Sequence, residues 1–504
     1  MIGGAKRGSP HFFPGQPMAI DTRSDPQGSL QRKTNWWGAF VIGLAGTLLV
    51  TGIGPSAVQG MGAAAIPVFF FVTGAGVVLC FCLAELAAMM PHRTGGLPSY
   101  ASETYKDLGP GVARHVGGLS AWSYGLGWFP VAPINMIIAA DYIAELWNLP
   151  PGAEFTPISA SITVTVLFIA LVGLLVLFVP CYLGIQLGAS FATLLGVVAM
   201  VPITLLVFLP FCAPTTLHWG NVAGFPLANP ADASFAFYTS WIFIISWSVF
   251  AMEAAACYIG ECRNPARDAK IAMTSSSLYG FFIYVSLPLM LVVVLGNATG
   301  VKPSTVFLLY TESIFGAGTW VRWVIGIPLV LALLLSVLNA LMGCGRSLYQ
   351  AAHDGLLPKF FEHTNRHGAP DYAMAFNLAC SVVVVFIASP LEIYIFSNMG
   401  YLLSVGLALF GYFLYRQRHP HVPRPVRMPG FLRYIALGIA IVIMFVWCYG
   451  GYYASDLVPE LAGKRWLFFL GLAVILLYLP LYAYRRYVED ARSINVVVAP
   501  AAEV

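Results

Sequence analysis

The stretch Thr51-Gly52-Ile53-Gly54-Pro55 interrupts the first long hydrophobic run of the chain. Glycine and proline both weaken a helix, so a helix that crosses this stretch is predicted to open there. A second interruption, Trp247-Ser248-Val249-Phe250-Ala251-Met252-Glu253, places a carboxylate inside the sixth run. Irregular backbone at membrane depth is tolerated only where protein or a watery cavity surrounds it. Paired interruptions in matching positions therefore predict the substrate site of a membrane transporter.

The composition is that of a membrane protein. Of the 504 residues, 59% are hydrophobic and 10% are charged, whereas soluble proteins carry about 25% charged residues. Apolar runs recur along the chain, and about 20 residues are enough to cross a bilayer as a helix. We predict an all-α integral membrane protein with twelve spans, at residues 36–61, 66–90, 118–147, 158–180, 188–212, 236–259, 271–296, 318–345, 372–389, 392–415, 431–454 and 465–487.

Two polar tails flank these runs. Residues 1–35 are rich in Gly, Pro, Ser and charge and lack the apolar core of a secretion signal. They are predicted to form a disordered cytoplasmic tail. Residues 488–504 are predicted to form a second cytoplasmic tail, and residues 36–487 a single transmembrane domain in contact with lipid.

Basic residues orient the spans. Of the 26 Lys and Arg, only Lys302, Arg322, Lys464 and Arg465 fall outside the cell if both termini are cytoplasmic. This bias follows the positive-inside rule and predicts a protein of the cell membrane. The net charge of +4 thus reflects topology, and no clustered basic face suggests a nucleic-acid partner.

Sequence motifs for other chemistry are missing. The nine cysteines form no zinc-like Cys-x-x-Cys pair, and neither a phosphate loop nor a nucleophile elbow occurs in the sequence. We therefore predict no metal, no cofactor and no enzymatic activity.

The two interruptions lie five spans apart. A unit of five helices has its ends on opposite sides of the membrane, so a second copy must insert upside down. We therefore predict an inverted repeat, about 36–212 and 236–415, with two extra helices at 431–487. The two halves share no clear sequence identity, and the prediction rests on the matched interruptions.

Four short motifs lie at predicted cytoplasmic ends of spans. They are Ala84-Glu85-Leu86-Ala87-Ala88-Met89-Met90-Pro91 with Gly95-Gly96 and Tyr100, Glu261-Cys262-Arg263-Asn264-Pro265-Ala266-Arg267-Asp268, Arg346-Ser347-Leu348-Tyr349 with Asp354-Gly355-Leu356-Leu357-Pro358, and Pro420 with Arg424-Pro425-Val426-Arg427-Met428-Pro429. Each resembles the motif at the same place in the amino acid–polyamine–organocation (APC) permeases of the amino acid transporter type. The four occur in the same order, and the resemblance covers about residues 36–430.

The resemblance implies a five-plus-five inverted-repeat fold like that of the bacterial leucine transporter, with helices one and six broken. It also implies amino acids or related amines as substrates. Two departures concern the broken helices. Ile53 replaces the serine of the usual Gly-Ser-Gly, and Ala251-Met252 replaces the usual Gly-Phe or Gly-Val before the acid. Both changes leave the break in place and make its lining bulkier.

Thr51, Gly52, Ile53 and Gly54 form the predicted carboxylate site. An opening there exposes backbone N–H groups at the start of the following half-helix. The partial positive charge of that helix end attracts a carboxylate. The alternative is a glycine seam that allows close helix packing.

Phe250, Ala251 and Met252 are predicted to offer free carbonyl oxygens to the substrate's ammonium group, at the negative end of the first half of span six. Trp247 lies about one turn earlier. By resemblance to the arginine/agmatine antiporter, it is predicted to be an aromatic lid that contacts the substrate through a cation–π interaction. Ordinary aromatic packing is the alternative for Trp247.

Acidic residues within spans are few. An ionisable residue inside a membrane span usually has a function, because burying it there costs free energy. Glu253 is therefore a candidate proton carrier. The alternative is a structural hydrogen bond that holds the broken helix. Glu85 lies near the interface and is predicted to be a structural anchor. Asp141 and Glu145 are predicted to be solvated groups at the outer end of span three.

The coupling ion is predicted from span eight. Ser336 matches by spacing the region where sodium-coupled relatives place hydroxyl groups, so it is a candidate ion-site residue. Val337 takes the place of a second hydroxyl, which favours a proton over sodium. Asn339 in the same span and Asn398 in span ten are candidate substrate contacts.

These patterns together predict a secondary active permease that moves an amino acid or a small amine by alternating access, as a symporter or an antiporter. A polyamine or amino-alcohol permease of the same fold is the alternative within this class. A nutrient sensor without transport, or a passive channel, is the alternative outside it.

Overall fold

The computed structural model describes residues 34–91, 93, 95–155, 162–184, 189–297, 302–318, 320–386 and 390–490. Both predicted tails lie almost entirely outside the described residues, so their predictions stay untested.

The described chain is predominantly helical. Its α-helices are α1 (Trp36–Leu48), α2 (Val50–Met61), α3 (Ala65–Met89), α4 (Leu97–Thr104), α5 (Pro110–Trp128), α6 (Val131–Leu146), α7 (Val164–Tyr182), α8 (Ala189–Phe208), α9 (Phe235–Phe250), α10 (Pro265–Leu295), α11 (Val306–Phe315), α12 (Val321–His353), α13 (Asp371–Val385), α14 (Pro390–Arg418), α15 (Leu432–Tyr453), α16 (Trp466–Leu476) and α17 (Tyr478–Tyr484).

Shorter elements join these helices. Strands β1 (Glu154–Phe155) and β2 (Ile162–Thr163) pair antiparallel, with Glu154 opposite Thr163. The 3₁₀ segments are η1 (Gly62–Ala64), η2 (Lys106–Leu108), η3 (Leu209–Cys212), η4 (Pro214–Thr216), η5 (Trp219–Val222), η6 (Pro230–Asp232), η7 (Ala251–Glu261), η8 (Pro303–Thr305), η9 (Lys359–Glu362), η10 (Ala454–Leu457) and η11 (Pro459–Leu461), and η12 (Arg485–Glu489) is a π-helical turn.

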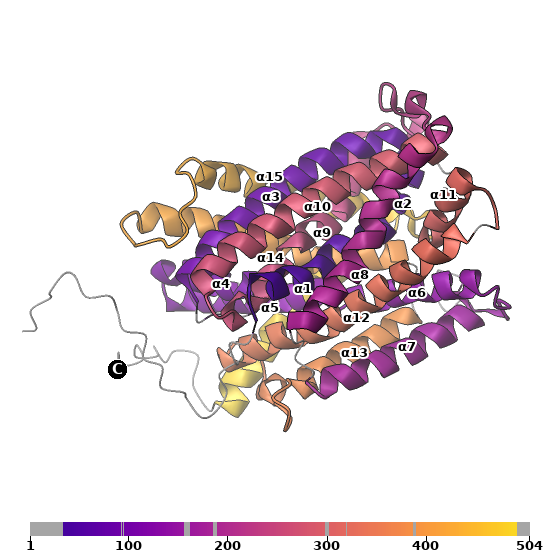
Figure 1. The fold of residues 1–504 in the computed structure, drawn as a ribbon. Coiled ribbons are helices and arrows are strands. Elements are labelled where there is room, and N and C mark those ends of the chain that lie inside the picture. Colours follow the sequence, from indigo (N-terminus) through magenta and orange to yellow (C-terminus); the bar gives the residue numbers. More distant parts are fainter. Residues whose placement is uncertain are drawn as a thin grey trace, which may run out of the picture. The chain divides into compact units, whose positions relative to one another are not determined.

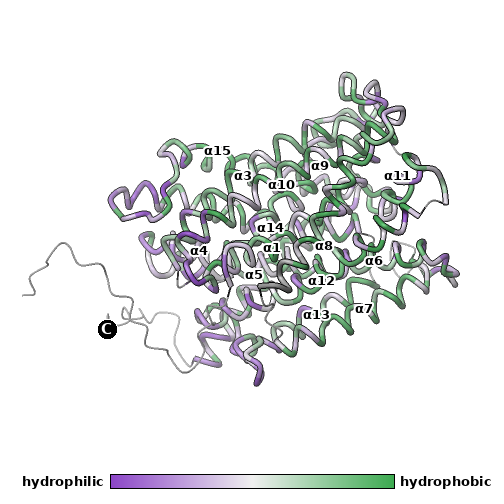
Figure 2. Tube along the Cα trace, in the orientation of Figure 1, coloured by the Kyte–Doolittle hydropathy of each residue, from purple (hydrophilic) through white to green (hydrophobic). Residues whose placement is uncertain are grey.

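Apolar helices dominate the structure. Among the described residues, nine helices are long and apolar enough to cross a membrane, and a bent pair, Gly196–Cys212 with Pro214–Val222, raises the number to ten. Helix α13 is apolar but has only 15 residues. Figure 2 shows hydrophobic residues along the helices and hydrophilic residues gathered near their ends. This distribution is that of a multi-pass membrane protein.

Helix α10 organises the packing around the first hydrophobic run. It lies alongside α3 (Figure 1) and also contacts α1, α2 and η7. Helix α12 packs against α5 and α6, α13 packs against α7, and α14 packs against α5 and α15. The interrupted segments therefore lie inside a shell of other helices.

The first run is interrupted at Leu49, which separates α1 from α2. The hydroxyl of Tyr284 donates a hydrogen bond to the Gly46 carbonyl over 2.8 Å. The N–H of Leu49 donates to the same oxygen over 3.3 Å, across three residues instead of the four of a regular α-helix. A side chain that inserts into the hydrogen-bond ladder breaks a helix. The predicted opening at Thr51–Pro55 is thus wrong in position, because this stretch is helical and belongs to α2.

The sixth run changes from α-helix to 3₁₀ helix at Ala251, where α9 passes into η7. The 3₁₀ segment has 11 residues, although such runs rarely exceed three or four and often mark a hinge. Ser276 of α10 donates its hydroxyl to the Met252 carbonyl over 2.7 Å. The change of geometry falls inside the predicted interruption, Trp247–Glu253.

Glycines bring the two interrupted runs into backbone contact. A Cβ placed on Gly46 would lie 1.9 Å from the carbonyl oxygen of Ala251, and one on Gly43 would lie 2.7 Å from the Cβ of Ala255. Only glycine leaves room for so close an approach. Helix α1 therefore rests directly on η7.

Candidate substrate-binding site

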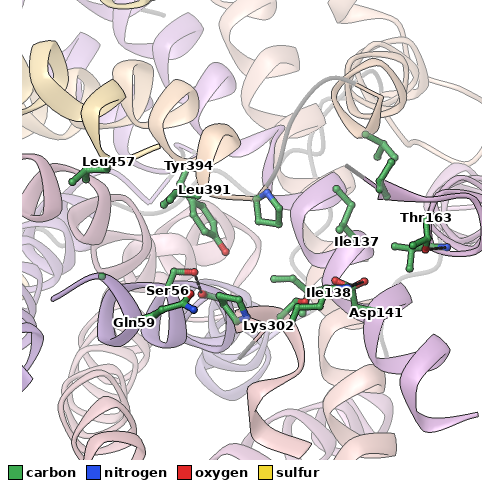
Figure 3. A pocket seen from close by; sticks show the side chains of 18 of the residues that line it. Ser56, Gln59, Ile137, Ile138, Asp141, Thr163, Lys302, Leu391, Tyr394 and Leu457 are labelled. Carbon is green, nitrogen blue, oxygen red and sulfur yellow. Dashed lines mark hydrogen bonds and ion pairs between the residues drawn. The ribbon is translucent and has the colours of Figure 1, made fainter. Parts of the chain in front are cut away.

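A cavity of about 400 Å³ lies beside the interruption of the first run. Residues from α2, α6, α7, α9, α13 and α14 line it, together with residues at β2, η8 and η10 (Figure 3). Its volume falls within the range of about 300–1,000 Å³ that is typical of small-molecule sites. Most of its lining side chains are apolar.

Gly52 and Tyr394 meet at one wall of the cavity. A Cβ on Gly52 would lie 2.1 Å from the Tyr394 hydroxyl oxygen and 2.8 Å from Cδ1 of Ile138. Tyr394 points into the cavity in Figure 3, and its ring packs on Trp247 with centroids 5.1 Å apart. The indole N–H of Trp247 donates to the Gly127 carbonyl over 2.9 Å. Trp247 therefore supports Tyr394 and does not itself line the cavity.

Asp141 and Lys302 form an ion pair at another part of the wall (Figure 3), with Nζ and Oδ1 2.5 Å apart. The Asp141 side chain is 6% exposed and the Lys302 side chain 59%. Asp141 is thus buried and paired, and the prediction of a solvated group there is wrong. Glu145, one turn further along α6, is exposed as predicted.

Of the predicted carboxylate-site residues, Gly52 lines the cavity and the other three do not. Thr51 donates its hydroxyl to a backbone carbonyl three residues earlier, over 2.7 Å. Ile53 is fully buried. A Cβ on Gly54 would make ordinary contact, 3.7 Å from Pro288 of α10. The cavity therefore reaches one face of the first turn of α2.

The predicted ammonium-site residues contact neighbouring helices. Phe250, Ala251 and Met252 are all buried and lie outside the cavity lining. The Ala251 carbonyl is covered by Gly46, and the Met252 carbonyl accepts the hydrogen bond from α10. From this helix, Trp241 and not Trp247 lines the cavity.

Glu253 is fully buried in η7 and lies outside the cavity lining. Its Oε1 accepts hydrogen bonds from the hydroxyls of Tyr124, over 2.8 Å, and Tyr401, over 3.1 Å. Within the described residues, its Oε2 has no hydrogen-bond partner. Cys257 Sγ lies 3.2 Å from the Tyr124 hydroxyl. The carboxyl group is thus held by two spans through one oxygen, while its other oxygen is unpaired.

The polar candidates of spans eight and ten join helices to one another. Ser336 accepts a hydrogen bond from the Asn135 amide of α6 over 2.7 Å. The Asn339 amide donates to the Ile42 carbonyl of α1 over 3.4 Å, and the Asn398 amide donates to a carbonyl of α9. None of the three candidates lines the cavity.

Glu85 forms a buried ion cluster at the end of α3. Its Oε1 lies 2.7 Å from Nε of Arg424 and 3.3 Å from Nε of Arg416, and its Oε2 accepts the Met428 N–H over 2.9 Å. The cluster ties the end of α3 to the connection between α14 and α15. This arrangement agrees with the predicted structural role.

Tyr394, Asp141 and Lys302 are cavity residues that sequence reasoning did not select. Lys302 is one of only four basic residues on the predicted outer side, and Asp141 is one of few acids in a predicted span. Because charged residues are scarce in these regions, both could have been selected as candidate site residues. The sequence around each of them does not indicate that they form an ion pair.

The profile of the family described as "Amino acid permease" matches residues 35–478. The chain belongs to this family. The match confirms the resemblance to the APC permeases and places this permease among transport proteins rather than enzymes, as predicted.

Curated relatives of the permease are distant. It is 22% identical over 224 residues to Solute carrier family 7 member 13 of Mus musculus, covering 44% of this chain and 46% of that one. It is 26% identical over 331 residues to Cationic amino acid transporter 4, vacuolar, of Arabidopsis thaliana, covering 64% and 51%. Amino-acid permease GAP3 of Candida albicans is 27% identical over 408 residues, covering 78% and 63%. The permease thus spans about half the length of the first two relatives.

Proposed function

We propose that this permease is a secondary active transporter that moves an amino acid across a membrane by alternating access. The observation that carries the proposal is the cavity of about 400 Å³ that reaches Gly52, in the first turn of α2. The partial positive charge at that helix start suits the carboxylate of an amino acid. The names of the relatives support the same class of substrate.

Substrate contacts deeper in the protein complete the proposal. The carbonyl groups of Phe250, Ala251 and Met252 take the ammonium group when α1 and η7 separate at the glycine contacts of Gly43 and Gly46. Trp247 acts as the gate through Tyr394, on which it packs. Thr51, Ile53, Gly54 and Asn339 enter the site in that second conformation.

Twelve spans in an inverted repeat form the proposed architecture. The first apolar stretch, Trp36–Met89, has 54 residues, and a bilayer core of about 30 Å needs only about 20. It therefore contains two spans, which separate where Gly62 adopts a φ of 65°. The bent pair and α13 supply one span each. Helices at equivalent positions in the two predicted repeats contact each other, namely α1 with η7, α3 with α10, α6 with α12, and α7 with α13. These contacts support a pseudo-twofold axis between the repeats.

The cell membrane is the proposed location, with both termini in the cytoplasm. The distribution of Lys and Arg supports this orientation. Two relatives carry the word vacuolar in their names, so an internal membrane is the alternative. Labelling of single cysteines introduced into either tail, from outside intact cells, tests the orientation.

A proton is the proposed coupling ion, with exchange of substrates as the alternative mode. The unpaired Oε2 of Glu253 offers a place for a proton inside the membrane. Sodium requires several oxygen ligands, and the Ser336 hydroxyl is already bonded to Asn135. The titratable groups around Glu253 are Tyr124, Tyr401 and Cys257, with Cys80 and Tyr100 further away.

Reconstitution into liposomes tests the proposed function. We expect labelled amino acids to accumulate against a gradient and to exchange with internal unlabelled substrate. Passive equilibration without exchange would indicate a channel, and binding without uptake would indicate a sensor. Uptake of putrescine or ethanolamine in preference to amino acids would favour the polyamine or amino-alcohol alternative.

A further inference from the structure

We infer that the cavity selects amino acids with uncharged side chains and rejects cationic ones. This inference rests on the proposed function and names the substrate class of the same site. Its basis is the Asp141–Lys302 ion pair and the apolar walls beside it.

The cavity offers one acidic and one basic side chain. Among the described lining residues, Asp141 is the only acid and Lys302 the only base. The undescribed segments that adjoin lining residues in the sequence, 156–161, 298–301 and 387–389, contain no charged residue. Any charge selection by the lining therefore depends on this pair.

The carboxylate of Asp141 is already neutralised. It lies 2.5 Å from the Lys302 ammonium group and is buried, whereas the Lys302 side chain is more than half exposed. A cationic side chain that enters would meet the exposed ammonium first and would have to displace it from Asp141. Like charges repel, so the occupied pair offers an entering cation no net attraction.

Other carboxylates near the cavity lie outside its described lining. Glu154, opposite Thr163 in the strand pair, is exposed to solvent. Glu312 pairs with Arg322 at 3.1 Å, and Glu145 projects to the exposed face of α6. Glu392 lines a different cavity, and Glu253 is buried outside the lining. Among the described lining residues, a second cation would therefore find no further counter-charge.

The remaining walls suit an apolar side chain. Ile137, Ile138, Val166, Val385 and Leu391 line the cavity. Contact with such walls favours hydrocarbon and disfavours an ammonium or guanidinium group without a partner. The family includes a relative named as a cationic amino acid transporter, so the selectivity inferred here distinguishes this chain from that relative.

A pair of related competitors tests the inference on the unmodified protein. Norleucine and lysine share an unbranched four-carbon side chain, to which lysine adds a terminal ammonium group. In proteoliposomes that take up labelled leucine, we expect norleucine to compete on the order of tenfold better than lysine. Norvaline and ornithine repeat the comparison one methylene shorter. Equal competition within both pairs would overturn the inference and leave the proposed function standing.

A charge substitution tests the role of the ion pair. Lys302→Met frees the Asp141 carboxylate, so we expect the ratio of lysine to leucine uptake to rise on the order of tenfold. Adding Asp141→Asn to this variant should bring the ratio back down. Lys464→Met, which removes another basic residue of the predicted outer side, exposed and outside the cavity lining, should leave the ratio unchanged.

The outcomes separate the two proposals. An unchanged ratio in Lys302→Met, with protein that elutes normally from gel filtration, would overturn the inference. If that variant does not fold, the norleucine and lysine comparison decides. Absence of uptake for every amino acid, neutral or cationic, would instead contradict the proposed function itself.

Discussion

At the scale of single residues, Gly52 sets the shape of the cavity. A methyl group there would meet the Tyr394 hydroxyl oxygen at 2.1 Å, and overpacking of this kind costs about 1–3 kcal/mol. We expect Gly52→Ala to displace Tyr394 and to weaken the apparent affinity for substrate on the order of tenfold. Uptake measured over a range of substrate concentrations checks this.

Gly54 provides the matched control for that substitution. It lies in the same helix, and a Cβ there makes ordinary contacts of 3.6 and 3.7 Å. We expect Gly54→Ala to lose less apparent affinity than Gly52→Ala, because Gly54 enters the proposed site only in the second conformation. A variant pair with equal losses would show that helix flexibility, rather than the cavity wall, is the property that matters.

Glu253 is the residue on which the proposed proton coupling depends. Gln preserves the shape and the hydrogen-bond acceptor for Tyr124 and Tyr401 but cannot release a proton. We expect Glu253→Gln to keep substrate exchange and to lose stimulation of uptake by an acidic exterior. Tyr401→Phe, which retains the carboxyl group, should keep that stimulation. A normal response of Glu253→Gln to a pH gradient would remove this residue as the proton carrier.

At the scale of elements, one hydroxyl joins the two interrupted runs. The Tyr284 oxygen lies 2.8 Å from the Gly46 carbonyl oxygen and 2.7 Å from that of Ser248. Removal of one partner from a buried hydrogen bond costs about 1–3 kcal/mol. We expect Tyr284→Phe to lower the melting temperature in detergent and also to reduce transport.

Tyr279 is a suitable control because it belongs to the same helix, α10. Its hydroxyl bonds to Thr204 over 2.9 Å and does not touch either interruption. We expect Tyr279→Phe to lower the melting temperature and to spare transport. If both variants transport equally well, the link between the interruptions has no role in the cycle.

At the scale of the whole molecule, a polar network joins distant parts of the chain at the ends of the helices. Arg93 pairs with Glu103 of α4 and, over 2.8 Å, with Asp354 after α12. Burial opposes the charged form of Glu103, but the hydrogen bond from Lys106 and the charge of Arg93 outweigh it and hold the pKa of this carboxyl below its ordinary value.

Acid should therefore loosen this network. Because the pKa of Glu103 is lower in the folded than in the unfolded protein, its stabilisation is complete above the ordinary value of 4.5. The stabilisation disappears as the pH falls through the folded value. We expect Glu103→Gln to be less stable at neutral pH and to lose less stability in acid. Melting curves between neutral and acidic pH check this, with Glu145→Gln, an exposed acid, as the control.

Much of the fold was predictable because a bilayer responds to local properties of the chain. Apolar runs of about 20 residues become helices wherever lipid or protein leaves the backbone no other partner. The interruption near Ala251 was visible because Glu253 cannot be placed in an ordinary lipid-facing helix. The family was recognisable from motifs whose residues are adjacent in sequence.

The tertiary structure alone decided the position of the first break and the lining of the cavity. Tyr284 and Gly46 are 238 residues apart in sequence, and Asp141 and Lys302 are 161 apart. Gly52 lines the cavity and Gly54 does not, because the helices that pack around α2 select one of its faces. Hydrophobicity is a property of each run by itself, whereas a contact between two runs depends on how all the others pack, and no local pattern records that.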